Sequence, residues 1–325
     1  MLHNKKSINE LGTYLEKTHL VVDLLFLEEL LCNAAKCKEP YKNKEFAIKM
    51  GCPINKTKNS ALTIYHWIKG NRTIPFTKIR KALELSDYNW QELEINVISI
   101  KAGIRNGEIY PQFPLHIGKE AGSILGYILG DGSIEKRFNA IFFTNTNKDL
   151  LIDFRNSMFT LFRVEPRIWV QQSGMFKQKS KWLYKCNSLD QIPSDHSIGL
   201  FYPKICSLIL FSIFGKFAEG KRKLITPEIK NSNKNIQKYL IRAFFDSEGS
   251  TYNYRNMIRV FQDDKQLLED IRILLLNFDI KTNEIHNYIK RDKKRHYFDI
   301  TNKENFTKFH ELIGFKSKKK RLFPV

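Results

Sequence analysis

The stretch Ile-Leu-Gly-Tyr-Ile-Leu-Gly-Asp-Gly-Ser, residues 124–133, contains the feature that decides the fold of this chain. An apolar run of helical character ends on one acid, Asp131, which stands between two glycines. Asp-Gly is a common turn, and glycine often follows the last residue of a helix. A single copy of this stretch therefore fits an ordinary helix end as well as a functional acid.

A second stretch, Tyr-Leu-Ile-Arg-Ala-Phe-Phe-Asp-Ser-Glu-Gly-Ser at residues 239–250, aligns with the first. Glu248 matches Asp131, and Gly-Ser follows both acids. The two acids are 117 residues apart (248 − 131). This spacing suits a unit of about a hundred residues that contains helices and strands and occurs twice.

The segments after the two acids show the same succession of patterns. After Asp131 we expect strands at 133–137 and 140–145, a helix at 148–162, strands at 167–172 and 181–186, and a helix at 203–214. After Glu248 we expect strands at 251–254 and 257–261, a helix at 265–277, strands at 284–290 and 296–300, and a helix at 303–313. Each unit thus has the order helix-strand-strand-helix-strand-strand-helix, which predicts an α+β fold.

Small residues recur every four positions in both stretches, namely Gly122, Gly126 and Gly130 in the first and Ala243 and Ser247 in the second. Residues at this spacing lie on one face of a helix, and small side chains let two helix backbones approach closely. If the two helices pack on each other, their C-terminal ends bring Asp131 and Glu248 together. Two such carboxylates repel unless a divalent cation or a shared proton lies between them. The matched acids therefore predict a metal site.

The charge balance indicates a polyanionic partner. The 325 residues include 54 Lys and Arg but only 34 Asp and Glu, so the formal net charge is +20. An excess of this size on a folded chain is typical of nucleic-acid binding.

The N-terminal residues Met-Leu-His-Asn-Lys-Lys are not followed by the apolar segment of a signal peptide, and the apolar runs are too short to span a bilayer. The five cysteines include no CxxC pair, so we expect reduced thiols and no structural zinc. These features predict a cytoplasmic protein, or one in a DNA-containing organelle matrix, that is not secreted and has no membrane partner.

Residues Ile124–Gly132 and Ile241–Gly249 resemble the two nine-residue motifs of a LAGLIDADG homing endonuclease in its single-chain, two-repeat form. The resemblance covers residues 115–325 approximately. It implies two pseudo-symmetric αββαββα repeats whose motif helices pack together and whose antiparallel sheets lie over the DNA major groove. We expect repeat 1 at 119–230 and repeat 2 at 231–325, after a small all-α domain at 1–100 and a connector at 101–118.

The resemblance also implies the ligands of a divalent metal, Mg²⁺ or Mn²⁺. The acids at the eighth motif position are Asp131 and Glu248, and the backbone carbonyls of Gly130 and Ser247 are the expected additional ligands. The chain departs from the family pattern at Leu129, where the family often has Asp, and at Ala243, where it usually has Gly. Neither departure falls on a ligand position.

The family carries one lysine per repeat near the scissile phosphate. In repeat 1 the candidate is Lys223, with Lys221 as the second choice. In repeat 2 the candidate is Lys319. An ordinary surface lysine, or one that faces a DNA phosphate, explains each position equally well.

Sequence recognition is expected from sheet strands in the major groove, because alternate residues of a strand face the same side. The candidate contacts on polar or basic strand residues are Tyr252, Tyr254, Arg255, Arg259, Lys290, Arg291 and Arg295. Each of them could instead be solvated or lie on a phosphate.

The N-terminal region contains a second DNA-binding candidate. Residues 63–75, Thr-Ile-Tyr-His-Trp-Ile-Lys-Gly-Asn-Arg-Thr-Ile-Pro, resemble the end of a Cro/repressor-type helix-turn-helix, with His66 and Arg72 as candidate DNA contacts. The first helix of that motif would be 44–50, and a further helix is predicted at 76–85. The gap between Gly51 and Thr63 is longer than in that family, so a helical bundle without DNA contacts is the alternative.

Together these features predict a monomeric, site-specific endonuclease that makes double-strand breaks in DNA and serves intron homing. The chain starts Met-Leu-His and ends Phe-Pro-Val, without the Cys or Ser and the His-Asn that a self-splicing intein needs, so we expect a free-standing enzyme. Two alternatives stay open on the same fold. One is a transcription regulator that binds DNA without cutting it, and the other is a maturase that binds intron RNA.

Overall fold

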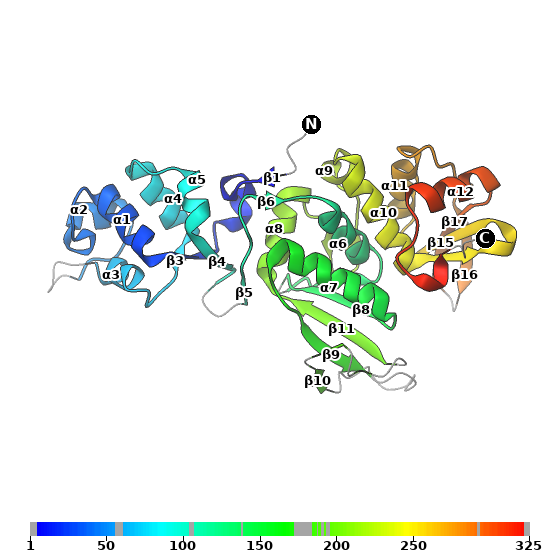
Figure 1. The fold of residues 1–325 in the computed structure, drawn as a ribbon, viewed down its shortest axis with the longest axis horizontal. Coiled ribbons are helices and arrows are strands. Elements are labelled where there is room, and N and C mark those ends of the chain that lie inside the picture. Colours follow the sequence, from blue (N-terminus) through cyan, green and yellow to red (C-terminus); the bar gives the residue numbers. More distant parts are fainter. Residues whose placement is uncertain are drawn as a thin grey trace. The chain divides into compact units, whose positions relative to one another are not determined.

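The computed structural model describes residues 5–55, 61–103, 107–137, 139–171, 184–186, 188, 189, 192, 196–290 and 293–321 (Figure 1). The chain divides into two compact units. Unit 1 contains Ile117–Tyr202 and Ile213–Val325, and unit 2 contains His3–His116 and Pro203–Ser212. Both matched acids belong to unit 1.

Repeat 1 begins with the first motif helix and continues into an antiparallel sheet. Its elements are α6 (Lys119–Leu129), β7 (Gly132–Ile134), β8 (Ile141–Asn145), α7 (Lys148–Phe162), β9 (Arg167–Gln171), β10 (Tyr184–Cys186), β11 (Ser197–Tyr202) and α8 (Lys204–Phe214). The strand order in the sheet is β10-β9-β11-β8-β7. Two short strands, β12 (Ala218–Glu219) and β13 (Arg222–Lys223), and helix α9 (Pro227–Lys230) lead to repeat 2.

Repeat 2 has the predicted succession of elements. They are α10 (Lys234–Glu248), β14 (Gly249–Tyr252), the 3₁₀ turn η3 (Asn253–Arg255), β15 (Met257–Gln262), α11 (Lys265–Leu276), β16 (His286–Lys290), β17 (Lys293–Ile300), α12 (Lys303–Leu312) and the 3₁₀ turn η4 (Lys318–Lys320). The sheet is antiparallel with the order β14-β15-β17-β16. The α+β fold with two repeats, each built on an antiparallel sheet, is therefore confirmed.

Repeat 1 differs from the expected αββαββα order by an additional strand. Strand β11, which the sequence analysis did not predict, pairs with both β8 and β9 in the middle of the sheet. The series β7-β8-β11-β9 corresponds to β14-β15-β17-β16, and β10 extends the edge. The buried Ile198, Leu200 and Tyr202 do alternate along β11. Gly199 and the apolar helix that follows directly hide this pattern, because glycine is uncommon inside strands.

Each sheet carries an aromatic core on one face. In repeat 1, the rings of Phe143 and Phe154 lie with their centroids 4.7 Å apart, and Tyr127 of the motif helix packs on both. In repeat 2, Phe245 of the motif helix packs on Phe309 of α12 at 4.7 Å and on Phe298 of β17. Burial of such rings supplies much of the free energy that holds a helix on a sheet. The motif helices are therefore fixed on their own sheets.

The expectation of an all-α N-terminal domain is wrong, because unit 2 contains a small sheet as well as helices. Besides most of α8, its helices are α1 (Leu24–Ala35), α2 (Lys44–Lys49), α3 (Leu62–Ile68), α4 (Phe76–Leu85) and α5 (Trp90–Asn96). The sheet has the order β3 (Ile74–Pro75), β2 (His19–Val22), β4 (Val97–Lys101) and β5 (Glu108–Ile109). The strands are very short and pair across long stretches of sequence, so no hairpin signal marks them. A further pair joins β1 (Lys5–Lys6) to β6 (Leu115–His116).

The helices of the proposed helix-turn-helix form where the sequence predicts them. Helices α2 and α4 match the expected segments, and Gly51 and Gly70 adopt φ angles of +58° and +68° just after α2 and α3. Such angles suit glycine at a helix end. Residues 56–60, between α2 and α3, lie outside the described part of the chain.

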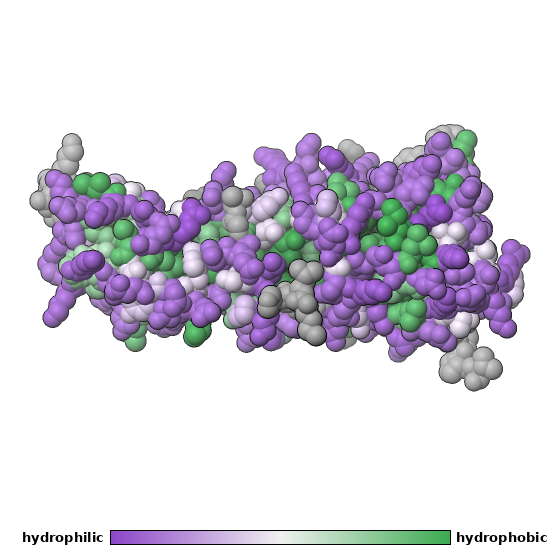
Figure 2. Space-filling view, turned by 90° about the horizontal axis from the view of Figure 1, so that it is seen from above, coloured by the Kyte–Doolittle hydropathy of each residue, from purple (hydrophilic) through white to green (hydrophobic). Residues whose placement is uncertain are grey.

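Hydrophilic residues cover most of the face in Figure 2, and hydrophobic ones form small separate areas. No helix in the described residues has the length and apolar character that a membrane span requires.

Candidate functional site

The two motif helices of unit 1 pack at very short range, and glycine makes this approach feasible. Figure 1 shows α6 and α10 side by side. A Cβ atom added to Gly122 or Gly126 would collide with the backbone carbonyl of Ile236 or Leu240. At Gly130 it would lie 2.5 Å from the Cβ of Ser247. Real Cβ atoms cannot occupy such positions, so the small-residue face predicted from the sequence is the face that joins the helices.

The C-terminal ends of the two helices bring the two matched acids close enough for their charges to interact. Glu248 is the last residue of α10, and Asp131 follows α6 by two residues. The Asp131 side chain is exposed and Glu248 is partly exposed, so solvent and ligands can reach the site. The surrounding protein still limits the hydration of both carboxylates. This arrangement agrees with the proximity that the sequence predicts.

Both acids lose protons less readily than in free solution. Desolvation raises the pKa of Asp131 to about 6, although Lys223, Lys320 and a hydrogen bond from Asn145 favour its charged form. Desolvation, together with the nearby Asp131 carboxylate, raises the pKa of Glu248 to about 7. The two carboxylates repel each other, and such a pair favours the binding of a cation between them.

Each acid has an amide partner that the sequence analysis missed. Asn145 Nδ2 donates to Asp131 Oδ2 at 2.8 Å, and Gln262 Nε2 donates to Glu248 Oε1 at 3.3 Å. Each amide stands 14 residues after its acid, near the end of the second strand of its sheet. This equal offset in the two repeats is a signal that the sequence does contain. It could have been found by comparing polar residues at matched positions.

Two lysines, one from each repeat, lie near the two carboxylates and donate hydrogen bonds to nearby backbone carbonyls. Lys223 on β13 donates to the carbonyl oxygen of Gly130. Lys320 on η4 donates to the carbonyl oxygens of Asp246 at 2.6 Å and Phe245 at 3.2 Å. Burial lowers the pKa of both ammonium groups, while the carboxylates Asp131 and Glu248 oppose this shift.

The lysine that lies near the two acids from repeat 2 is Lys320, one residue after the predicted Lys319. Lys319 is exposed and makes no contact with the carboxylates, whereas its neighbour Lys320 is partly buried beside them. Lys221, the second choice in repeat 1, is also exposed. The structure brings together Asp131, Glu248, Lys223 and Lys320 and leaves Lys319 and Lys221 outside this group.

The oxygen atoms at the site fit a hard divalent cation. Mg²⁺ is commonly held by one or two carboxylates together with phosphate oxygens and water. Among the described residues, no group of three or more His, Cys, Asp or Glu side chains gathers as a metal cluster. The two carboxylates would therefore share the cation with backbone oxygens, water or a bound phosphate. The Gly130 carbonyl, an expected ligand, accepts the Lys223 hydrogen bond and keeps a second lone pair that a cation could use.

Ser247, the other residue expected to offer a carbonyl, lies against Gly130 at the helix interface. Its side-chain hydroxyl is buried without a hydrogen-bond partner. The small side chain is needed there for the close approach of the helices, which explains why a residue of this size follows Asp246.

The expected DNA contacts of repeat 2 fall into two groups. Tyr254, with 77% of its surface exposed, and the exposed Arg255 stack on each other at the turn η3 beside Tyr252. Arg259 forms two hydrogen bonds of 2.7 Å to Asp299 on the neighbouring strand, and its guanidinium lies 4.3 Å from the Tyr297 ring centre. The first group is free to contact a ligand, whereas Arg259 already has a structural partner.

The remaining candidates are spread over both units. Arg295 on β17 donates to Asp263 at 2.6 Å, and Lys290 is the last residue of β16. Arg291 lies outside the described residues. His66 and the exposed Arg72 belong to unit 2, on and just after α3.

Comparison with known proteins identifies the repeats. The sequence model of the LAGLIDADG-like domain matches residues 118–188 and 235–314 of this chain. The two matched segments contain α6 with its acid and α10 with its acid.

Individual relatives are distant. The DNA-directed RNA polymerase subunit Rpo1C of Methanocaldococcus jannaschii is 26% identical over 284 residues, which are 87% of this chain and 29% of that protein. This chain spans less than a third of the length of the curated relatives it matches. Among solved structures, I-WcaI bound to its DNA recognition sequence has a TM-score of 0.42 at 17% identity, covering 64% of this chain and 87% of that one. I-DmoI in complex with DNA and Mn has a TM-score of 0.40 at 15% identity, covering 60% and 96%.

Proposed function

Because residues 118–188 and 235–314 are two copies of a LAGLIDADG-like domain, we propose that the protein is a site-specific endonuclease that makes double-strand breaks in DNA. The observation that carries this proposal is the meeting of Asp131 and Glu248 at the ends of two helices that pack through glycine. A fold alone does not require two acids with raised pKa values at its symmetry axis. Two acids that can each bind a divalent cation would serve the hydrolysis of two phosphodiester bonds, one on each strand.

The residues of each repeat would have different roles in such a reaction. Asp131 and Glu248 would hold the metal, Mg²⁺ or Mn²⁺, with the backbone of Gly130 and Ser247 as further candidates. The bound cation would polarise the phosphoryl oxygen and favour the ionised form of a bound water. Asn145 and Gln262 hold the carboxylates in place through their amide groups. Lys223 and Lys320, whose ammonium groups lie near these acids, would offer a positive charge to a DNA phosphate.

The rest of the surface suits recognition of a long duplex. The net charge of +20 favours association with DNA in a way that depends on salt. Tyr254 and Arg255 project from the sheet of repeat 2, and Arg72 is exposed in unit 2. We propose these residues as DNA contacts, and unit 2 as a helix-turn-helix-like extension of the binding footprint.

Selection from random DNA tests the proposal, because it works for a target of any sequence. A pool of duplex DNA with random sequence is incubated with the protein and Mg²⁺, and the cleaved ends are sequenced. We expect one long, specific site to be enriched among the ends, and we expect EDTA to abolish the cleavage. Selective binding from the same pool without any cleaved product would instead support a regulator. Tighter binding to structured RNA than to any duplex DNA would support a maturase.

A further inference from the structure

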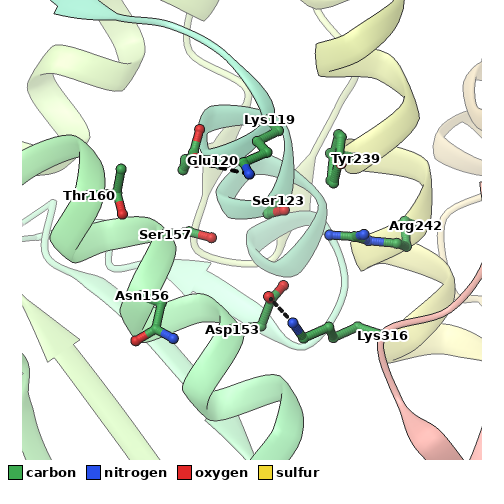
Figure 3. A pocket seen from close by; sticks show the side chains of 10 residues that line it. All are labelled: Lys119, Glu120, Ser123, Asp153, Asn156, Ser157, Thr160, Tyr239, Arg242 and Lys316. Carbon is green, nitrogen blue, oxygen red and sulfur yellow. Dashed lines mark ion pairs between the residues drawn. The ribbon is translucent and has the colours of Figure 1, made fainter.

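Unit 1 contains a polar pocket that lies away from the carboxylate site. It has a volume of about 280 Å³ and is lined by Lys119, Glu120, Ser123, Asp153, Asn156, Ser157, Thr160, Tyr239, Arg242 and Lys316 (Figure 3). The α6 residues of this pocket belong to the N-terminal half of the helix, whereas Asp131 follows its C-terminal end. Helix α6 is about 16 Å long at 1.5 Å per residue. The pocket is thus separate from the candidate cleavage site.

One cation of the pocket, Arg242, has no ion pair within the described residues, although its charge acts on the Asp246 carboxylate. Lys316 pairs with Asp153 at 3.1 Å, and Asp153 also accepts a hydrogen bond from Tyr127 at 3.0 Å. Lys119 pairs with Glu120 at 3.9 Å. In the part of the chain that the structure describes, the Arg242 guanidinium forms no ion pair and no hydrogen bond, and it lies 4.2 Å from the ring centre of Tyr239. An arginine carries five N–H donors, and those of Arg242 that face the pocket are available to a ligand.

The fold does not explain an arginine at this position. Arg242 is the second residue of its motif, and the matching residue of the first motif is Leu125, which is fully buried. An arginine stacked on an aromatic ring is held in place and keeps its planar set of donors directed outward. This arrangement is suited to an oxyanion with two oxygen atoms in one plane, such as a phosphate.

Two serines line the same pocket, and neither hydroxyl forms a hydrogen bond among the described residues. Ser123 on α6 has only 3% of its surface exposed, and Ser157 on α7 has 7%. Both hydroxyls face the open pocket and can donate to a ligand there. Figure 3 shows Ser123, Ser157 and Arg242 reaching this space from three different helices. An oxyanion in the pocket would supply acceptors for all three.

We propose that this pocket binds a phosphate group, either as the free ion or on a small molecule. Arg242 forms the charged contact, and the hydroxyls of Ser123 and Ser157 donate to the remaining oxygens. The pocket exceeds the size of a phosphate ion, so it has room for the body of a phosphomonoester. Its walls come from α6 and α7 of repeat 1 and from α10 and Lys316 of repeat 2. A bound phosphate would therefore hold the two repeats together.

The proposal is tested on the whole protein by isothermal titration with inorganic phosphate and, separately, with AMP. We expect saturable binding of at least one of them, and the comparison of the two identifies the free ion or the phosphomonoester as the better ligand. Arg242→Gln should weaken this binding by about tenfold or more, because it removes a charged hydrogen-bond donor. The matched control is Arg163→Gln, which removes another arginine stacked on an aromatic ring, outside the pocket, and should leave binding unchanged.

A second variant protects the test against misfolding. Ser157→Ala removes one hydroxyl without adding volume, and it should weaken phosphate binding several-fold. The midpoint of its unfolding in urea should be equal to that of the wild type or higher, which shows that the variant is folded. The proposal is overturned if the wild type binds neither ligand saturably, or if Arg242→Gln and Ser157→Ala both bind as the wild type does. None of these measurements involves DNA, so their outcome is independent of the proposed cleavage.

Discussion

Lys223 and Lys320 occupy corresponding places in the two repeats, but they stand on different local structures. Lys223 lies on the short strand β13, whereas Lys320 ends the 3₁₀ turn η4. Neighbouring residues of a strand face opposite sides, while those of a 3₁₀ turn are rotated by about a third of a circle. The three consecutive lysines 318–320 therefore point in three directions. Of these three, Lys320 lies near the carboxylates.

The two lysines give a strand-specific prediction. Lys223→Met and Lys320→Met should each slow the cleavage of one DNA strand by about a hundredfold, the typical cost of removing one electrostatic contact to the transition state. Nicked plasmid should then accumulate. The control is Lys319→Met, which changes the exposed neighbour and should linearise plasmid like the wild type. Gel separation of nicked and linear plasmid measures the cleavage rates of both strands. Equal cleavage rates for the Lys319 and Lys320 variants would contradict the assignment of Lys320.

His310 gives a prediction about pH. Desolvation among Phe306, Phe309 and Phe315 lowers its pKa to about 4, and its Nε2 atom is buried without a partner. The unfolded chain, with the ordinary value of 6.5, therefore binds more protons between pH 6.5 and pH 4. The stability that the neutral imidazole contributes is present above pH 6.5 and is lost as the pH falls toward 4.

Urea unfolding checks this prediction. His310→Phe should lose less stability than the wild type as the pH is lowered from 6.5 to 4, because the phenyl ring does not titrate. The same substitution at His286, which is exposed on β16, is the matched control. If the His310→Phe and wild-type curves stay parallel over this range, the buried imidazole does not have the assigned role.

At the level of helices and strands, much of the fold follows from the sequence alone. The helices α7 and α4 form with the predicted limits, because capping residues such as Asn147 and regular apolar spacing mark them. The contact between α6 and α10 follows from small residues at every fourth position. Strand β11 and the sheet of unit 2 escaped prediction, since their pairing partners are distant in sequence. In β11, Gly199 and the apolar helix that follows also hide the alternation of buried residues.

The candidate site, too, could be predicted from the sequence only in part. Asp131 and Glu248 could be found because they occupy equal positions in two copies of a motif. Asn145 and Gln262 were missed because a single amide on a strand carries no signal until the two repeats are aligned beyond the motif. The choice of Lys320 depends on the backbone of η4, which no sequence pattern specifies.

The segment that carries Lys320 is held by an acid found only in the second motif. The buried carboxylate of Asp246 accepts hydrogen bonds from the backbone N–H groups of Lys316 at 2.8 Å and Ser317 at 3.0 Å. The matching residue of the first motif is Leu129, which is buried and apolar. The two repeats thus position their lysines by different means.

This anchor predicts an asymmetric defect. Asp246→Asn should retain the fold but loosen the segment 316–320, so that cleavage of one strand slows by about tenfold, the value of one charged hydrogen bond. The affected strand should be the one that Lys320→Met affects. Asp279→Asn, at an exposed acid paired with Lys308, is the control and should not change either strand. Equal slowing of both strands by Asp246→Asn would contradict a local role for the anchor.

For the molecule as a whole, charge is the property that dominates binding. The net charge of +20 is carried by folded units, and the face shown in Figure 2 is mostly hydrophilic. DNA affinity should therefore fall steeply with salt, with a slope of log affinity against log salt of about −0.9 for each phosphate neutralised. Arg255→Gln and Arg72→Gln should each reduce this slope by about one. Filter binding over a range of salt concentrations measures the slope, and an affinity that does not depend on salt would rule out phosphate contacts as its source.

The central claim is that Asp131 and Glu248 together form a metal-dependent cleavage site. The most direct test uses supercoiled plasmid that carries the cleaved site, incubated with Mg²⁺ and the wild type, Asp131→Asn or Glu248→Gln. Both substitutions keep the size of the side chain and remove one charge, so DNA binding should persist. We predict linear plasmid with the wild type and no linear plasmid with either variant. Linearisation by either variant at the wild-type rate would contradict the account, as would tight binding by the wild type that leaves the plasmid supercoiled.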